Sequence, residues 1–339
     1  MHPACFTAFF NFPLSIILNL NTLKIVVLDG FALNPGDLSW NKLKELGEYV
    51  IFDRTQPEEI LDRAIGAEVL ITNKVIINKA LMDKLPLLKY IGVTATGYNV
   101  VDIQAARELN IVVTNIPAYS TDSVAQLVFS HILNVTNRVE LHANSVRIGE
   151  WIKSPDFSYS KSPQTELAGK TLGIVGFGRI GRKVADIGLA FGMKVIFQNR
   201  SEKTDMLSGI VQKGLSDVFA ESDFVSLNCP LNAENIEFVN RDLLETMKPT
   251  SVLINTGRGG LINEQDLANA LQSGQISAAC LDVLSTEPPM PDNPLISVQN
   301  CFITPHIAWA TFEARCRLLS ITIDNLKSFV EGNPLNVVN

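Results

Sequence analysis

Histidine and cysteine, the side chains that most often bind transition metals, are scarce in this chain of 339 residues. It has four histidines, at positions 2, 131, 142 and 306, and five cysteines, at positions 5, 229, 280, 301 and 316. Neither set shows the spacing of a metal site, and no two cysteines form a C-x-x-C motif. We therefore expect no bound metal. The cysteines are expected to be mostly small core residues in a reducing, cytoplasmic compartment.

The chain also lacks blocks of like charge. Its net charge is −7 and its isoelectric point is near 5.2, which argues against a binding surface for nucleic acid or for an anionic membrane. With 46% apolar residues and this length, the chain is predicted to be a soluble globular protein of two domains.

Residues 1–23 contain no Lys, Arg, Asp or Glu. They also lack the basic start and the small-residue cleavage site of a signal peptide, and Pro13 interrupts the apolar run. A mis-assigned start codon, an extension outside the fold and a membrane anchor are the alternatives for this segment. We leave it out of the fold prediction and expect no membrane partner.

From Lys24 onward, short β-rich runs alternate with amphipathic segments, which is typical of parallel sheets covered by helices. The first series is predicted to contain strands at Ile25–Asp29, Tyr49–Phe52, Val69–Thr72, Leu88–Val93 and Ile111–Thr114, and helices at Trp40–Leu46, Pro57–Ile65, Lys79–Lys84 and Ile103–Leu109. The second is predicted to contain a long helix from about Ser123 to Ile148, strands at 172–175, 194–197, 224–228, 252–255, 278–282 and 302–303, and helices near 179–191, 240–247 and 263–272.

Two such series predict an α/β protein with two Rossmann-like or flavodoxin-like lobes and a cleft between them. A first hinge is expected near Pro117. The helical stretch Phe312–Val330 follows the last strand and is predicted to return to the first lobe, with a second hinge near Pro305. The larger, doubly wound dinucleotide-binding domain, residues 118–307, is then inserted into a smaller substrate domain, residues 24–117 plus 308–339.

The strand at 172–175 runs directly into Gly176, Gly178 and Gly181, which have the G-x-G-x-x-G spacing, and a helix-like segment follows. In this context the first glycine allows a tight turn, the second lets the backbone approach a pyrophosphate, and the third lets helix and strand pack closely. The start of the helix offers unpaired N–H groups to the anion. A dinucleotide site is therefore predicted here, the alternative being a glycine-rich turn without a ligand.

The residues after the second strand of this unit favour NADP(H) over NAD(H). NAD sites usually place an Asp or Glu about 20 residues beyond the glycines, to accept from the ribose hydroxyl. Here the strand ends in Asn199, Arg200 and Ser201, with Lys203 close behind. Arg200 suits a phosphate, and Ser201 can donate a further hydrogen bond. In the alternative, Arg200 stacks on the adenine and Asn199 holds the ribose hydroxyl.

Charged residues follow three later apolar strands, where open α/β sheets place their ligands. They are Arg258, Glu287 and His306. Each has an ordinary explanation: a solvated turn residue, a surface charge on a loop and a structural histidine. After a dinucleotide motif they also form a complete set for hydride transfer to a 2-keto acid. Histidine exchanges the proton, a carboxylate fixes its tautomer, and arginine binds the substrate carboxylate.

At these residues, and over Ala95–Asp102, the chain resembles the D-isomer-specific 2-hydroxyacid dehydrogenases, and within them the glycerate dehydrogenase and hydroxypyruvate reductase branch. The resemblance extends from Lys24 to the end. It implies that His306 is the acid/base paired with Glu287, that Arg258 clamps the substrate, and that Thr96 and Gly97 present N–H groups to the substrate. It also implies a homodimer through a paired helix at Ser123–Trp151, and cofactor contacts at Arg179, Ile180, Cys229, Pro230, Thr256, Gly257, Arg258, Asp282 and His306.

Two features narrow the expected substrate. The chain stops at residue 339, which leaves no room for the C-terminal module of long phosphoglycerate dehydrogenases. Trp309 is typical of the hydroxypyruvate reductase branch and would narrow the substrate pocket, its alternative role being ordinary packing. Hydroxypyruvate and D-glycerate are the expected pair, with glyoxylate or another 2-keto acid as the alternative. A different class of protein, a corepressor-like NAD(H)-sensing binding protein, can retain the same residues. A methyltransferase would leave them without a role.

Overall fold

The computed structural model describes residues 23–203 and 209–339, so most of the predicted N-terminal extension lies outside the described residues. The chain divides into two compact units. Unit 1 runs to Tyr119 and resumes over Phe312–Asn339, and unit 2 is Ser120–Thr311. Within the described ranges, no helix is both long enough and apolar enough to span a membrane.

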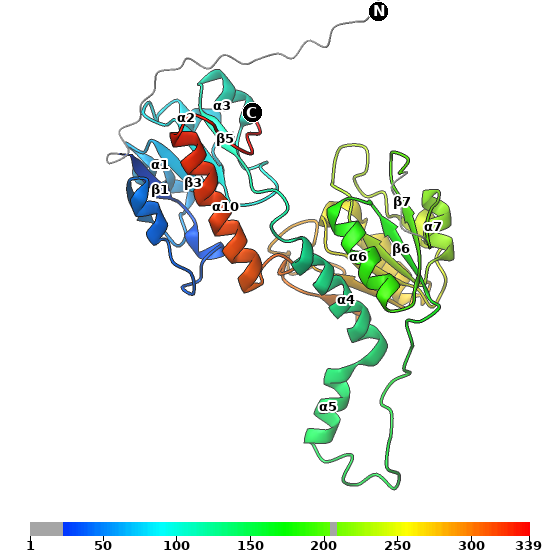
Figure 1. Cartoon of the computed structure of the whole chain (residues 1–339). Coiled ribbons are helices and arrows are strands. Elements are labelled where there is room, and N and C mark those ends of the chain that lie inside the picture. Colours follow the sequence, from blue (N-terminus) through cyan, green and yellow to red (C-terminus); the bar gives the residue numbers. More distant parts are fainter. Residues whose placement is uncertain (1–22, 204–208) are drawn as a thin grey trace, which may run out of the picture. The chain divides into compact units, whose positions relative to one another are not determined.

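The described part of unit 1 is built on one parallel sheet with the strand order β2-β1-β3-β4-β5 (Figure 1). Its strands are β1 (Lys24–Val27), β2 (Glu48–Ile51), β3 (Val69–Thr72), β4 (Tyr90–Val93) and β5 (Val112–Thr114). Its α-helices are α1 (Ile60–Ala64), α2 (Lys79–Met82), α3 (Ile103–Glu108) and α10 (Phe312–Val330).

The last helix returns to unit 1, as the sequence predicted. The ring of Phe329 on α10 lies 4.9 Å from that of Tyr90 on β4. Asn325 donates to the carbonyl oxygen of Asn115 at 3.0 Å, and Val338, beyond the helix, donates its N–H to Val113 at 2.9 Å. These contacts join the C-terminal segment to β4, to β5 and to the residue after β5, all more than two hundred positions earlier in the sequence.

Unit 2 contains a second parallel sheet, with the order β12-β11-β10-β9-β6-β7-β8. Its strands are β6 (Thr171–Val175), β7 (Lys194–Gln198), β8 (Ile210–Gln212), β9 (Phe224–Leu227), β10 (Val252–Asn255), β11 (Ala278–Leu281) and β12 (Cys301–Ile303). Its α-helices are α4 (Thr121–Asn137), α5 (Val139–Arg147), α6 (Arg179–Ala190), α7 (Leu215–Glu221), α8 (Arg241–Leu244) and α9 (Glu264–Gln272).

Alternate strand residues of unit 2 enter two separate cores, because successive side chains of a strand point to opposite faces. On β10, Val252 and Ile254 pack in the core that includes residues of α4 and α6, whereas Leu253 packs in the core that includes residues of α7, α8 and α9. All four β10 residues are buried. Helices therefore cover both faces of the sheet, which leaves the ends of its strands for ligands. The two-lobed α/β fold expected from the sequence is confirmed.

The predicted single helix from Ser123 to Ile148 is wrong in one respect. Arg138 takes a left-handed backbone conformation, with φ of 47°, and separates α4 from α5. In Figure 1, α5 and the loop after it project from the body of unit 2. The predicted helix at Trp40–Leu46 is instead a 3₁₀ helix over Asn41–Glu45, and β8 and α7 were not predicted.

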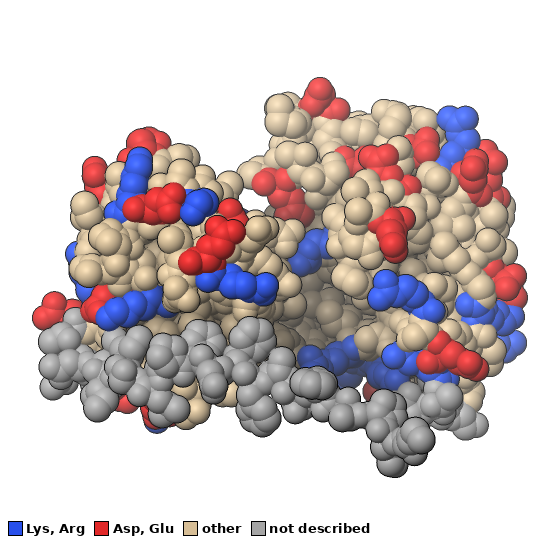
Figure 2. All heavy atoms as spheres, turned by 90° about the horizontal axis from the view of Figure 1, so that it is seen from above, with Lys and Arg blue, Asp and Glu red and all other residues tan. Residues whose placement is uncertain are grey.

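Figure 2 shows acidic and basic side chains interspersed among uncharged ones on the face that it presents. Several of the described charges form exposed pairs, such as Lys79 with Asp83 at 3.3 Å and Lys213 with Glu221 at 2.6 Å. Exposed pairs of this kind contribute little to stability.

Candidate active site

The glycine-rich turn joins β6 to α6. Gly176 has a φ of +93°, and a Cβ added there would lie 2.5 Å from the backbone nitrogen of Cys229. A Cβ on Gly181 would lie 2.2 Å from the carbonyl oxygen of Gly176, so both close approaches require glycine. A Cβ on Gly178 would meet nothing within 4 Å, and no side chain caps the start of α6. The backbone at Gly178 is therefore open to a ligand.

Two buried side-chain oxygens near this turn have no hydrogen-bond partner among the described residues. They are Oδ1 of Asn228, directly after β9, and Oγ1 of Thr256, directly after β10. Strand order reverses between β6 and β9, and open α/β sheets bind ligands at the carboxyl edge of such a reversal. Unpaired buried oxygens cost free energy that a ligand with N–H or O–H groups removes.

These features fit a dinucleotide. Its pyrophosphate is an anion that suits the uncapped start of α6, and its carboxamide and ribose groups are donors that suit the unpaired oxygens. Of the predicted contacts, Arg179 and Ile180 begin α6, Cys229 and Pro230 follow β9, and Thr256 and Gly257 follow β10. Asn228 was not predicted, because only the fold shows that this half-buried residue has a buried oxygen without a partner.

The segment after β7 is held by side-chain hydrogen bonds. Asn199 accepts from the backbone N–H of Phe177 at 3.2 Å and donates to Oγ of Ser201 at 3.1 Å. Gln212 on β8 donates to the carbonyl oxygens of Asn199 and Ser201, at 3.2 and 3.3 Å. The Arg200 side chain is exposed. Since the Ser201 hydroxyl accepts from Asn199, its own proton is available to a ligand.

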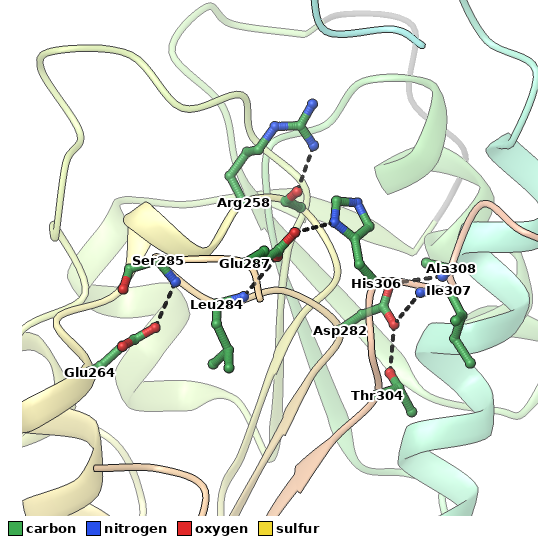
Figure 3. Close-up of polar contacts among 11 residues, drawn as sticks. Arg258, Glu264, Asp282, Leu284, Ser285, Glu287, Thr304, His306, Ile307 and Ala308 are labelled. Carbon is green, nitrogen blue, oxygen red and sulfur yellow. Dashed lines mark hydrogen bonds and ion pairs between the residues drawn. The ribbon is translucent and has the colours of Figure 1, made fainter. Parts of the chain in front are cut away.

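The structure brings Glu287 and His306 together (Figure 3). Nδ1 of His306 lies 2.6 Å from Oε2 of Glu287, and the other carboxylate oxygen accepts the N–H of Leu284 at 3.0 Å. An ionised carboxylate only accepts hydrogen bonds, so Nδ1 carries the proton and Nε2 is the nitrogen that exchanges one. The side chains of His306 and Glu287 are 41% and 37% exposed, which leaves them accessible to a substrate.

Arg258 leads into a turn that packs against the segment before Glu287. A Cβ on Gly259 would lie 1.9 Å from the carbonyl carbon of Leu284, which shows how closely the two backbones approach. The guanidinium donates to the carbonyl oxygen of Gly257 at 2.8 Å, and its side chain is exposed. Figure 3 shows Arg258, Glu287 and His306 reaching the same region from different loops.

Asp282 holds the backbone around His306. It is 1% exposed, and its carboxylate accepts the N–H groups of Ile307 at 2.9 Å and Ala308 at 2.7 Å, while its carbonyl oxygen accepts that of His306 at 2.8 Å. His306 has a φ of 53°, a left-handed conformation that disfavours a side chain by about 1–2 kcal/mol. The three hydrogen bonds stabilise this conformation and so direct the imidazole.

The predicted substrate residues Thr96 and Gly97 lie in unit 1, after β4. Thr96 donates its hydroxyl to the carbonyl oxygen of Ile116 at 3.0 Å, and Asn115 donates to the carbonyl oxygen of Thr96 at 2.8 Å. Within the described part of the chain, neither Thr96 nor Gly97 donates its backbone N–H to an acceptor. Trp309 lies in unit 2 and is partly buried.

Comparison with known proteins identifies the family. Residues 129–308 match the model of the D-isomer specific 2-hydroxyacid dehydrogenase NAD-binding domain. A hydroxypyruvate reductase of Blautia hydrogenotrophica is 43% identical over 324 residues, which cover 94% of this chain and 100% of the relative. A glycerate dehydrogenase of Methylorubrum extorquens is 38% identical and covers 94% of this chain and 99% of its own.

A solved structure extends the likeness to the fold. The NADPH-dependent glyoxylate/hydroxypyruvate reductase of Sinorhizobium meliloti, in complex with NADP and malonate, superposes with a TM-score of 0.77 at 29% identity. The match covers 94% of this chain and 97% of that one. Because the family model matches more than half of the chain and relatives match along almost all of it, the chain belongs to the D-isomer-specific 2-hydroxyacid dehydrogenases, which are nicotinamide-dependent oxidoreductases.

Proposed function

We propose that this protein interconverts hydroxypyruvate and D-glycerate with NADPH as its preferred cofactor, and that it acts in the cytoplasm. The observation that carries the proposal is the 2.6 Å contact between Glu287 and His306, beside an exposed arginine in a dinucleotide-binding unit. The names of the two relatives, a hydroxypyruvate reductase and a glycerate dehydrogenase, support this substrate pair. Glyoxylate, which the name of the solved reductase includes, is the second substrate candidate.

The residues divide the work of the reaction. When bound, the nicotinamide supplies or accepts the hydride. His306 gives the proton from Nε2 to the substrate oxygen during reduction, and Glu287 stabilises the positive ring and keeps it oriented. Arg258 binds the substrate carboxylate with its planar, permanently charged guanidinium and polarises the reacting carbonyl. Thr96 and Gly97 present backbone N–H groups to the substrate.

Two further roles follow from position. The Asp282 carboxylate is the proposed acceptor for the nicotinamide amide, in addition to the backbone N–H groups that it already binds. Trp309, three residues after His306, is proposed to narrow the pocket so that it favours small acids such as hydroxypyruvate and glyoxylate.

The preference for NADPH rests on the segment after β7. Position 199 is an asparagine, whereas a carboxylate there would repel the ribose phosphate of NADPH. The exposed Arg200 follows directly. The ordered Ser201 hydroxyl has a proton to donate. Arg200→Ala is expected to weaken NADPH binding about tenfold or more and to leave NADH binding nearly unchanged, because only NADPH has the extra phosphate. Equal losses for both cofactors would indicate that Arg200 stacks on the adenine instead.

The substrate is tested by a kinetic panel. We expect kcat/KM to be highest for hydroxypyruvate with NADPH, lower for glyoxylate and lowest for pyruvate, which lacks the C3 hydroxyl group of hydroxypyruvate. The measurement follows the loss of NADPH absorbance with each acid, and repeats it with NADH. A clear preference for pyruvate or for another 2-keto acid would contradict the assignment to hydroxypyruvate while leaving the family unchanged.

We also propose that the protein is a homodimer through α5 and the loop after it. This segment exposes large apolar side chains: Ile148 is 72% exposed, Ile152 89% and Phe157 90%. Contiguous exposed apolar residues mark interaction surfaces, and the same segment of a second copy is a partner of matching character. Ile152→Asp is expected to convert dimers to monomers in light scattering, whereas Ile76→Asp, at a 65% exposed residue of unit 1, leaves them intact.

A further inference from the structure

A histidine that no part of the proposed mechanism uses lies close to the active site. His131, on α4, is 5% exposed, and its Nε2 lies 3.3 Å from the hydroxyl oxygen of Thr304, just after β12. That hydroxyl lies 2.6 Å from Oδ1 of Asp282, the carboxylate that holds the backbone of the His306 segment. Thus a line of polar contacts runs from α4 to the loop of the proposed acid/base.

The direction of each hydrogen bond follows from counting protons. A threonine hydroxyl has one proton, and the carboxylate of Asp282, at 2.6 Å, is a closer acceptor than the carbonyl oxygen of Leu281, at 3.5 Å. The proton therefore points to Asp282, and the hydroxyl can only accept from His131. Burial lowers the pKa of His131, which favours the neutral ring, and its single proton must then be on Nε2.

The line of contacts ends on the backbone of the His306 loop. Oδ1 of Asp282 accepts from Thr304 and from the N–H of Ile307, and Oδ2 accepts from the N–H of Ala308. The Thr304 hydroxyl thereby fixes the rotation of a carboxylate that must face two backbone N–H groups at once. Hydrogen bonds in a chain polarise one another, so donation from His131 strengthens the bond from Thr304 to Asp282.

We propose that His131 and Thr304 are positioning residues for catalysis: His131 donates to Thr304, Thr304 donates to Asp282, and Asp282 fixes the backbone that aims His306. This inference rests on the proposed function, because it gives His306 the role of acid/base. The effect of His131 is smaller than that of Thr304, since its contact is longer than the usual range for an N–H···O hydrogen bond.

The first test is kinetic and uses pairs of variants. Thr304→Val removes the hydroxyl at nearly constant shape and is expected to lower kcat about tenfold to a hundredfold, the usual effect of losing a hydrogen bond to a charged group. Thr304→Ser retains the hydroxyl and is expected to retain kcat. KM for hydroxypyruvate is expected to change little, because Arg258 is untouched. If Thr304 had a mainly structural role, kcat would fall in both variants in proportion to their loss of thermal stability.

The second test removes the other end of the line. His131→Leu is expected to lower kcat about threefold to tenfold, and His131→Gln, which retains a donor, to restore it. Leucine is preferred to alanine because a pocket of about 450 Å³ borders His131 and Thr304 and would admit water to a smaller side chain. Ser130→Ala, one residue away, is the matched control, since that hydroxyl donates to its own helix at Gln126.

A double-mutant cycle decides whether His131 acts through the hydroxyl of Thr304. If it does, His131→Leu has no further effect on kcat once Thr304 is valine. Independent losses in the double variant, or full activity of His131→Leu alone, would overturn the inference. If Thr304→Val does not fold, the comparison of His131→Leu with His131→Gln still decides it.

A readout without turnover separates this inference from the proposed function. Amide hydrogen exchange over residues 306–310 is expected to be faster in Thr304→Val than in Thr304→Ser or the wild type, because Ile307 and Ala308 lose a fixed acceptor. Unchanged exchange would overturn the inference. A wild-type protein that fails to reduce any 2-keto acid would instead overturn the proposed function.

Discussion

The two units have the same kind of parallel sheet but use the point of strand reversal in opposite ways. In unit 1 the strand order reverses between β1 and β3, and Asp29 from the end of β1 fills that point. Its carboxylate accepts the N–H groups of Asn73 at 2.7 Å and Val75 at 3.2 Å, and also that of Lys74. In unit 2 the reversal between β6 and β9 has glycines instead, with open space at Gly178 and unpaired oxygens nearby.

The same sheet architecture can therefore have its point of strand reversal either filled by a side chain or open to a ligand. In unit 1, backbone N–H groups donate to a carboxylate of the protein itself. In unit 2, the N–H groups at the corresponding point are expected to donate to an anionic ligand. The charge sign is the same, but in one case it belongs to the chain and in the other to the ligand. Removing the Asp29 carboxylate is therefore expected to lower the stability of unit 1. Changes at the corresponding point of unit 2 are expected to impair ligand binding or catalysis.

The largest effect is expected at His306, the proposed acid/base in unit 2. His306→Ala is predicted to lower kcat for hydroxypyruvate reduction about 10²- to 10⁴-fold, because it removes the proposed proton donor. NADPH binding, measured by fluorescence titration, is expected to persist, since the glycine turn is intact. Undiminished turnover by this variant would show that another group is the proton donor.

A second prediction concerns the open space at the glycine turn. Gly178→Val is expected to weaken NADPH binding about tenfold to a hundredfold, because the added side chain blocks the approach of the pyrophosphate to the backbone. The melting temperature is expected to stay near that of the wild type, because a Cβ there meets nothing within 4 Å. Normal NADPH affinity would mean that the cofactor does not lie against this turn.

The corresponding change in unit 1 is expected to affect stability alone. Asp29→Ala leaves the N–H groups of Asn73 and Lys74 without their acceptor, whereas that of Val75 retains the hydroxyl of Thr72. The variant is predicted to lower the free energy of unfolding by about 2 kcal/mol, measured by urea denaturation. Asp83→Asn is the control, because Asp83 forms only an exposed pair with Lys79. If Asp29→Ala lost NADPH binding at full stability, the distinction between the two points of strand reversal would be wrong.

The smallest effect is expected from the titration of His131. Burial lowers its pKa below the ordinary value of 6.5, with Asp282 acting in the opposite direction. As the pH falls, the unfolded chain therefore binds this proton first, so stability is complete above about pH 6.5 and decreases below it. The urea midpoint is measured at about pH 7.5 and at about pH 5.5. The difference between the two midpoints is expected to be smaller in His131→Gln than in the wild type, because the variant lacks the titrating ring. An unchanged difference would contradict a buried, neutral His131.

The regular elements could be predicted closely where the apolar pattern is strong. The bounds of β3, β10 and α10 match the structure. Asn263, the first residue of the helix predicted near 263–272, accepts the N–H of Asp266 as the N-cap of α9. β8 was missed because it is a three-residue edge strand with no fully buried side chain. The break at Arg138 was missed because neither glycine nor proline marks it.

The candidate site was predictable in its parts but not in its connections. The glycine turn, Arg258, Glu287 and His306 are visible as motifs at the ends of strands. The contact between His131 and Thr304 joins residues that are 173 positions apart, and only packing of α4 on the sheet brings them together. The unpaired oxygen of Asn228 is equally invisible in the sequence, because it depends on burial.

The proposed reaction is tested most directly by measuring binding and turnover in the same preparation of the full chain. NADPH affinity is determined first, and hydroxypyruvate is then added while NADPH absorbance and D-glycerate are followed. We expect tight NADPH binding and formation of one D-glycerate for each NADPH consumed. A protein that binds NADPH but consumes none with hydroxypyruvate, glyoxylate or pyruvate would contradict the proposed reaction and would favour a nucleotide-sensing protein on the same scaffold.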